Sequence, residues 1–161
     1  MWFDRNAEEA IQYYVDVFAK SPHSAAQSRI VTIQRYPEGI KEGPMAGFDG
    51  KVLTGVFELE GQRFMGLDGG PIFKPSGAIS YLVECKDQEE IDYFWGKLSA
   101  VPEAEQCGWC KDKFGFTWQI TPDMSRWMNS QDKEASGRAM QAMLAMKKIS
   151  IADLEKAYDG K

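Results

Sequence analysis

The stretch Cys107–Pro122, which reads CGWCKDKFGFTWQITP, decides how the second half of this chain is expected to fold. Two largely apolar segments flank a four-residue turn, Asp-Lys-Phe-Gly at 112–115. Short apolar runs separated by a tight turn that contains glycine predict two antiparallel β-strands. We therefore predict a β-hairpin whose strands span 106–111 and 116–121.

The same stretch contains a Cys-x-x-Cys pair, Cys107 and Cys110, a spacing typical of zinc sites and of thiol redox sites. Two residues three apart on a regular strand face opposite sides, so they are not expected to bind one ion together. A redox pair normally opens a helix, whose dipole lowers the thiol pKa, whereas a turn and another strand follow here. We interpret both as ordinary strand cysteines, unless a β-bulge brings them together.

The sequence predicts the same order of elements twice. The first copy begins with a short strand at the N-terminus and a helix from Asn6, a good N-cap residue, to Lys20. Three strands are expected to follow, at 29–36, 52–59 and 63–67. The second copy begins with a strand at 78–85 and a helix at 87–99 that Asp87 caps, and the hairpin completes it.

This order predicts an α+β fold of two modules with a helical extension at the C-terminus. The expected boundaries are 1–75, 76–122 and 123–161. The loop 37–50 is longer than most connections, which favours a flap or a binding loop. In the extension, Met140, Met143 and Met146 recur at helical spacing, and we interpret them as a packing face, with a dimer surface as the alternative.

The composition is that of an ordinary globular protein. Of the 161 residues, 43% are apolar and 27% are charged, so a packed core is expected. The net charge of −5 argues against nucleic acid or an anionic membrane as a partner, because both attract basic proteins. No membrane span, signal peptide or disulfide framework is recognised among the residues, and the protein is therefore expected to be cytoplasmic.

Several stretches together resemble one protein family. Asp112-x-Phe114-Gly115 followed by an apolar strand resembles the closing hairpin of the glyoxalase/bleomycin-resistance/extradiol-dioxygenase group, the vicinal oxygen chelate superfamily. The opening WFDRNAEEAIQYYVDVF resembles the first helix of the same group. With FELEGQRFMGLDGGP, ISYLVEC and MLAMKKISIADLEKAY, the chain is most similar to the PhnB-like branch, often labelled 3-demethylubiquinone-9 3-methyltransferase.

The resemblance implies two βαβββ modules whose curved strands form an open, cup-shaped sheet. A partner subunit often completes this cup, so a homodimer is expected. Catalytic members of the superfamily hold one divalent metal in the cup with His, Glu or Gln ligands, and the metal polarises a substrate oxygen.

The matching ligand positions are poorly filled in this chain. Gln119 occupies the position on the last strand, Asp68 lies near the one on the fourth strand, and the first-strand position falls before Met1. An amide and one carboxylate are a thin ligand set for a divalent ion. We therefore expect no cofactor, with a divalent metal at Gln119 and Asp68 as the weaker alternative.

Strand alternation predicts which side chains face the cup. The expected ligand contacts are Phe57, Met65, Ser80, Trp109 and Gln119, with Leu82 beside them and Asp68 added by the resemblance. Aromatic and methionine side chains with few polar groups suit a planar or apolar small molecule. We therefore predict a small-molecule-binding protein that works without a catalytic metal.

The alternative is an enzyme of the same superfamily. It would be a metal-dependent lyase, isomerase or dioxygenase, or the methyltransferase of the family label. The residues do not support that label, because the chain has no G-x-G-x-x-G turn after a strand to hold an adenosyl cofactor.

Overall fold

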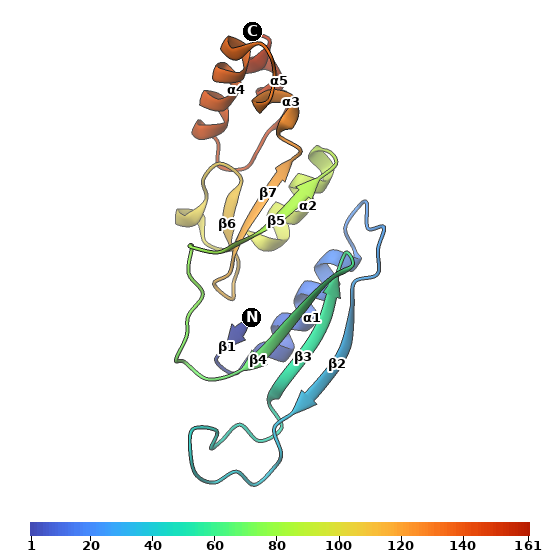
Figure 1. The fold of residues 1–161 in the computed structure, drawn as a ribbon, viewed down its shortest axis with the longest axis vertical. Helices are drawn as coiled ribbons and strands as arrows, with labels where there is room; N and C mark the ends of the chain where they lie inside the picture. The colour runs from blue at the N-terminus through green and yellow to red at the C-terminus, as the bar shows by residue number, and fades with distance from the viewer. The chain divides into compact units, whose positions relative to one another are not determined.

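A computed structural model describes residues 1–161, and the chain divides into two units, Met1–Pro75 and Ser76–Lys161 (Figure 1). The first unit holds a sheet of four strands and the second a sheet of three, and helices accompany both. The predicted α+β class is therefore confirmed. None of the helices is both long and apolar enough to cross a lipid bilayer.

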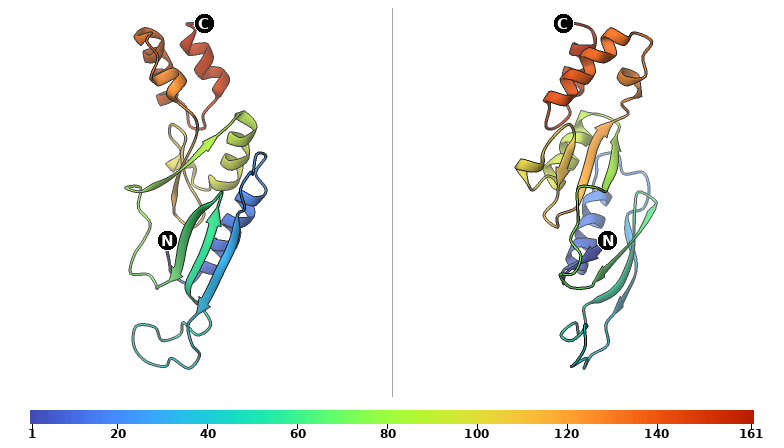
Figure 2. Two further views of the ribbon diagram at one scale, coloured as in Figure 1. Left: turned by 45° about the vertical axis from the view of Figure 1, so that its right-hand side comes forward. Right: turned by 60° about the vertical axis from the view of Figure 1, so that its left-hand side comes forward.

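The first unit has the predicted βαβββ order. Its elements are β1 (Trp2–Phe3), α1 (Ala7–Ala19), β2 (Arg29–Arg35), β3 (Val52–Leu59) and β4 (Gln62–Asp68). The sheet order is β1-β4-β3-β2, with β1 parallel to β4 and the other pairs antiparallel. Helix α1 lies along one face of this sheet (Figure 2). Ile11, Tyr14 and Phe18 are buried on the helix because they share one side of it.

The start of α1 differs from the expectation. Asn6 precedes the helix but its side chain makes no capping hydrogen bond. Instead, the carboxylate of Asp68 accepts a hydrogen bond from the amide of Ala7 at 2.8 Å and another from the amide of Val52 at 3.1 Å. A side chain at the end of β4 thus satisfies a free amide of the first helical turn.

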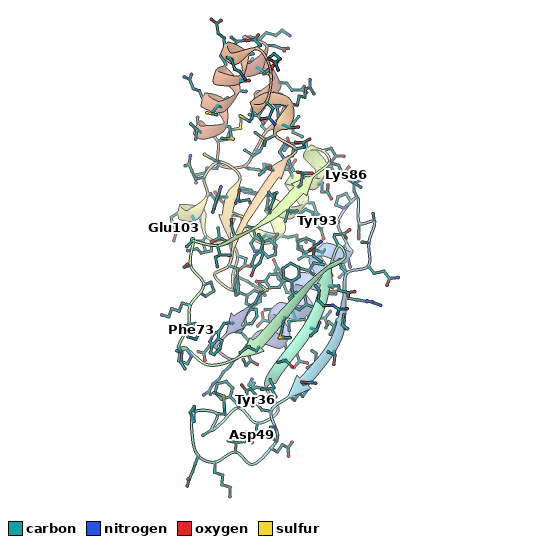
Figure 3. The ribbon with its side chains drawn as sticks, viewed as in Figure 1. Tyr36, Asp49, Phe73, Lys86, Tyr93 and Glu103 are labelled. Atoms are coloured by element: carbon teal, nitrogen blue, oxygen red, sulfur yellow. The ribbon has the colours of Figure 1, made fainter.

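The long loop between β2 and β3 is braced within the first unit. Its base is closed by the Tyr36 amide, which donates to the Lys51 carbonyl at 2.9 Å. Phe48 is buried and packs edge-on against Tyr36, with ring centroids 5.5 Å apart. The carboxylate of Asp49, labelled with Tyr36 in Figure 3, accepts from the Gly39 amide at 2.5 Å. Whether this loop acts as a flap stays a prediction.

The second unit repeats most of this arrangement. Its elements are β5 (Ser80–Cys85), α2 (Gln88–Leu98), the short 3-10 helix η1 (Pro102–Ala104), β6 (Trp109–Lys111), β7 (Thr117–Pro122), α3 (Ser125–Met128), α4 (Lys133–Ala145) and α5 (Ile151–Tyr158). The sheet order is β5-β7-β6, with β5 parallel to β7 and β6 antiparallel to it. This is the pattern of β1-β4-β3 without a counterpart of β2, so the second module is one strand short of βαβββ.

The first strand of the predicted hairpin is shorter than expected. Cys107 and Gly108 have positive φ angles of 51° and 82° and are the central residues of a tight turn. The amide of Trp109 donates to the carbonyl of Gln106 at 2.7 Å, and the amide of Gln106 donates to the carbonyl of Trp109 at 3.0 Å. The strand therefore begins at Trp109, whereas the second predicted strand is confirmed as β7.

The C-terminal helices α3, α4 and α5 gather at the end of the second sheet where β7 finishes (Figure 1). The predicted cap of α2 is confirmed, because Asp87 accepts from the Glu90 amide, and Ser150 caps α5 in the same way by accepting from the Asp153 amide. Helix α2 covers one face of the sheet with the buried residues Ile91, Phe94 and Leu98. The other sheet face is left for the site described next.

Candidate functional site

A groove of about 760 Å³ lies in the second unit, between the face of the sheet that α2 does not cover and the C-terminal helices. Strands, turns and helices all contribute to its lining. The lining residues are Leu82, Glu84, Ala104, Gln106, Cys107, Trp109, Gln119, Thr121, Pro122, Met124, Met143 and Leu144. Its volume is in the range of pockets that hold a small organic molecule.

The floor of the groove is a row of three side chains across the three strands. Gln119 on β7 is in register with Leu82 on β5 and with Trp109 on β6. Residues in register lie on the same face of a sheet, so an aliphatic, an amide and an aromatic side chain stand side by side. The neighbouring row contains Trp118 and Cys110, which are buried on the opposite face.

The amide of Gln119 is held in place. Its Nε2 donates a hydrogen bond of 2.7 Å to the hydroxyl of Ser80. Ser80 lies two residues before Leu82 on β5 and therefore on the same face of the sheet. An amide bound through its nitrogen retains its oxygen as an acceptor for a ligand donor. Ser80 therefore orients Gln119 rather than lining the groove itself.

The two cysteines of the Cys-x-x-Cys pair lie in different surroundings. Cys107 is on the turn before β6, lines the groove, and contacts the carbonyl of Leu144 through its sulfur at 3.5 Å. Cys110 is buried on the face covered by α2, and this burial raises the pKa of its thiol to about 12. All three cysteines are free thiols, and no group of three or more His, Cys, Asp or Glu side chains is arranged to hold a metal ion.

Phe57 and Asp68 were expected to contact a ligand, and the structure places both elsewhere. Phe57 is fully buried on the α1 side of the first sheet, stacked between Tyr14 and Phe64. Strand alternation shows which residues share a face with Phe57, but it does not tell which face of the sheet the helix covers. Asp68 is also buried, and both carboxylate oxygens accept backbone amides, which leaves it a structural role.

Met65 is the third expected contact in the first unit. It is 52% exposed and lies on the face of β4 opposite to Phe64. Of the seven residues expected near a ligand, Leu82, Trp109 and Gln119 line the same groove, and Ser80 is bonded to Gln119.

Sequence reasoning missed several residues of the groove. Glu84 follows Ser80 and Leu82 at alternate positions of β5, so strand alternation was sufficient to find it. Met143 and Leu144 come from α4, and no local pattern in the sequence indicates which face of that helix approaches the sheet.

Comparison with known proteins identifies relatives of this chain. The family model described as 3-demethylubiquinone-9 3-methyltransferase matches residues 1–121. A PhnB protein from Bacillus cereus, of solved structure, is 34% identical with a TM-score of 0.57, and the match covers 75% of this chain and 95% of that chain.

A protein of solved structure from Staphylococcus aureus is 26% identical, and the match covers 74% of this chain and 88% of that chain, with a TM-score of 0.31. That score is too low to support a structural comparison. No curated protein sequence matches the chain.

Proposed function

Because this chain belongs to the 3-demethylubiquinone-9 3-methyltransferase (PhnB-like) family, we propose that it binds a small, partly apolar molecule in the groove of the second unit. The observation that carries this proposal is the row of Leu82, Gln119 and Trp109 on the uncovered sheet face. An indole ring and an aliphatic side chain offer flat apolar surface, and the amide between them orients a polar group of the ligand.

The donors present support binding without a catalytic metal. Gln119 offers a single neutral amide oxygen, and Asp68 uses both of its carboxylate oxygens for backbone amides. The groove itself contains one carboxylate, that of Glu84. Hard divalent ions prefer several charged oxygen ligands, which this set does not supply.

The proposal is tested with the neutral fluorescent probe Nile red and the intact chain. Replacing Trp109 by alanine removes the aromatic part of the floor, and we expect the affinity for the probe to fall by roughly 3- to 10-fold. Trp95→Ala is the matched control, because Trp95 belongs to α2 and does not line the groove. Equal affinities of the two variants and the unmodified protein would contradict the proposal.

Methyl transfer, or another reaction of the glyoxalase group, is the second candidate, and the family match over residues 1–121 favours it. The sheets in both units are mixed rather than doubly wound, and adenosyl cofactors of Rossmann-type enzymes need a parallel sheet with a glycine-rich turn. Elemental analysis of the purified protein, followed by incubation with S-adenosylmethionine and a catechol, separates the candidates. A methylated product, or a stoichiometric ion that Gln119→Ala abolishes, would favour the enzyme.

We also propose that the protein forms a homodimer, as the resemblance implies. Met65 and Val31 are exposed apolar residues of the first unit, which supports an association through this unit. Light scattering coupled to gel filtration gives the mass directly, and a monomer at micromolar concentration would contradict this expectation.

A further inference from the structure

The C-terminal extension, 123–161, supplies part of the lining of the groove. Met143 and Leu144 on α4 and Met124 before α3 line it together with Trp109 and Leu82 of the floor, and we call these three residues the wall. All three lie beyond residue 121, where the family match ends. The family core therefore provides the floor, and a segment outside the matched region provides the wall.

Backbone hydrogen bonds fix this wall to the sheet. The amides of Cys107 and Gly108 donate to the carbonyls of Met146 and Lys147, at 2.8 and 2.7 Å. The side-chain amide of Gln106 donates to the carbonyl of Leu144 at 2.6 Å. The turn before β6 is thus bonded to the chain that leaves α4, and the wall is held at a set position relative to the floor.

A second anchor lies just after the wall. Ile149 is fully buried, and its carbonyl accepts from the side chain of Gln88 on α2 at 3.1 Å. The same Gln88 side chain accepts from the amide of Ile151 at 2.9 Å. The C-terminal segment is therefore integrated into the core of the second unit rather than resting on its surface.

Both sides of the groove present exposed apolar surface. Leu82 on the floor is 63% exposed and Leu144 on the wall is 54% exposed, although both are large aliphatic residues. A ligand that fills the space between them removes this surface from water, which is favourable in proportion to the apolar area buried. The flexible side chain of Met143 adapts to the shape of such a ligand.

The charge of the groove is negative. Glu84 is the one charged residue in its lining, and its carboxylate makes no ion pair or side-chain hydrogen bond. Glu84 also borders a neighbouring cavity of about 450 Å³ that contains Lys86 and Arg126, of which Arg126 is paired with Glu155 at 2.6 Å. A cationic group at this end of the groove has a carboxylate partner, whereas an anionic group meets repulsion.

We infer that the wall formed by Met143 and Leu144, together with Glu84, makes the groove selective for an amphiphile with a flat apolar body and a cationic amine or pyridinium end. This inference rests on the proposed function of the groove and adds the ligand class. It also assigns specificity to a segment that lies outside the matched family core.

Three fluorescent probes test the inference on the full chain: a cationic styrylpyridinium dye, neutral Nile red and anionic anilinonaphthalene sulfonate. We expect the cationic probe to bind more tightly than the anionic one. Glu84→Gln should lower the affinity for the cationic probe by about 2- to 5-fold, which is the range of an exposed ion pair, and leave the affinity for Nile red unchanged. Glu89→Gln, on α2, is the matched control for the loss of one charge.

The wall is tested by Met143→Ala and Leu144→Ala, with Met140→Ala as the matched control on the same helix. Met140 is 47% exposed and does not line the groove. We expect both wall variants to lower the affinities for the cationic probe and for Nile red by roughly 3- to 10-fold, and the control to change neither affinity. Thermal unfolding of each variant confirms that it is folded, and Leu144→Ala keeps the test valid if Met143→Ala is not.

The possible failures are distinguishable. Suppose that the unmodified protein binds the probes. If the wall variants then bind them with the same affinity as Met140→Ala, the inference is overturned while the proposed function stands. The same follows if Glu84→Gln leaves the affinity for the cationic probe unchanged. If the unmodified protein binds none of the three probes, both fall. Preference for the anionic probe would overturn the assigned ligand class alone.

Discussion

Asp112 shows how a residue that marks a family is explained by local bonding. Its side chain is 1% exposed, and one carboxylate oxygen accepts from the amides of Phe114 and Phe116 at 2.8 and 3.0 Å. The other oxygen accepts from the indole nitrogen of Trp118 at 2.7 Å. The Asp-x-Phe-Gly motif is therefore a turn whose aspartate fastens the hairpin and a core tryptophan, and its role in this unit is structural.

We predict that Asp112→Asn lowers the free energy of unfolding by about 1–3 kcal/mol, because one oxygen becomes an NH₂ group facing donors. Asp112→Ala should cost more, since it leaves all three donors, two of them buried, without an acceptor. Urea denaturation at neutral pH measures both. Asp4→Asn is the control, because Asp4 is exposed and its carboxylate makes no hydrogen bond. Equal stability of Asp112→Ala and the control would contradict the assignment.

At the scale of elements, the turn before β6 has two functions. It reverses the chain through two residues of positive φ, and it bonds to the segment that leaves α4. Gly108 is required here, because a Cβ would lie 3.0 Å from the Ile120 carbonyl oxygen and 3.1 Å from Ile149. Gly108, which the sequence pattern places within a strand, is thus a contact point between the sheet and the C-terminal extension.

We predict that two glycine-to-alanine substitutions in the second unit have opposite effects. Gly108→Ala should lower the free energy of unfolding by about 1–3 kcal/mol, because its backbone conformation and its surroundings both exclude a side chain. Gly137→Ala should raise it by about 0.5–1 kcal/mol, because Gly137 is exposed within α4 and no atom lies within 4 Å of the added Cβ. Denaturant unfolding compares the two, and a shift in the same direction for both would refute the description of this turn.

At the scale of the whole molecule, each unit has its own sheet and its own buried core. Phe57 and Tyr14 belong to the core of the first, and Trp118 and Phe94 to that of the second. The boundary at Pro75 lies in a segment without helix or strand, between the end of β4 and the start of β5. In this segment Phe73 is 62% exposed, although its ring meets the edge of Trp2 at 4.9 Å.

We predict that limited proteolysis with chymotrypsin first cuts the chain after Phe73, because exposed backbone outside regular structure is the preferred substrate of proteases. The expected fragments are 1–73 and 74–161, and mass spectrometry identifies them. Phe73→Ser should slow this first cut strongly and serves as the control. A first cut after Phe48 or Phe114 instead would show that the boundary segment is better protected than the other loops.

The sequence predicted more of the fold than of the site. Hydrophobic periodicity placed α1, α2 and β7 within one or two residues, and the Asp87 cap formed as expected. Trp109 and Gln119 were found because strand alternation is strict once both strands of the hairpin are known. Phe57 was misplaced, since alternation does not tell which face of the sheet is covered and only the packing of α1 decides this.

The sequence by itself determined the types and order of the elements, the α+β class and the family, because these follow from local periodicity, turn residues and matching motifs. The tertiary structure alone decided which sheet face stays uncovered, that Asp68 bonds Ala7 and Val52, and that α4 provides a wall of the groove. These contacts join residues far apart in the chain. Their positions depend on how helices pack on sheets, and short-range patterns do not carry that information.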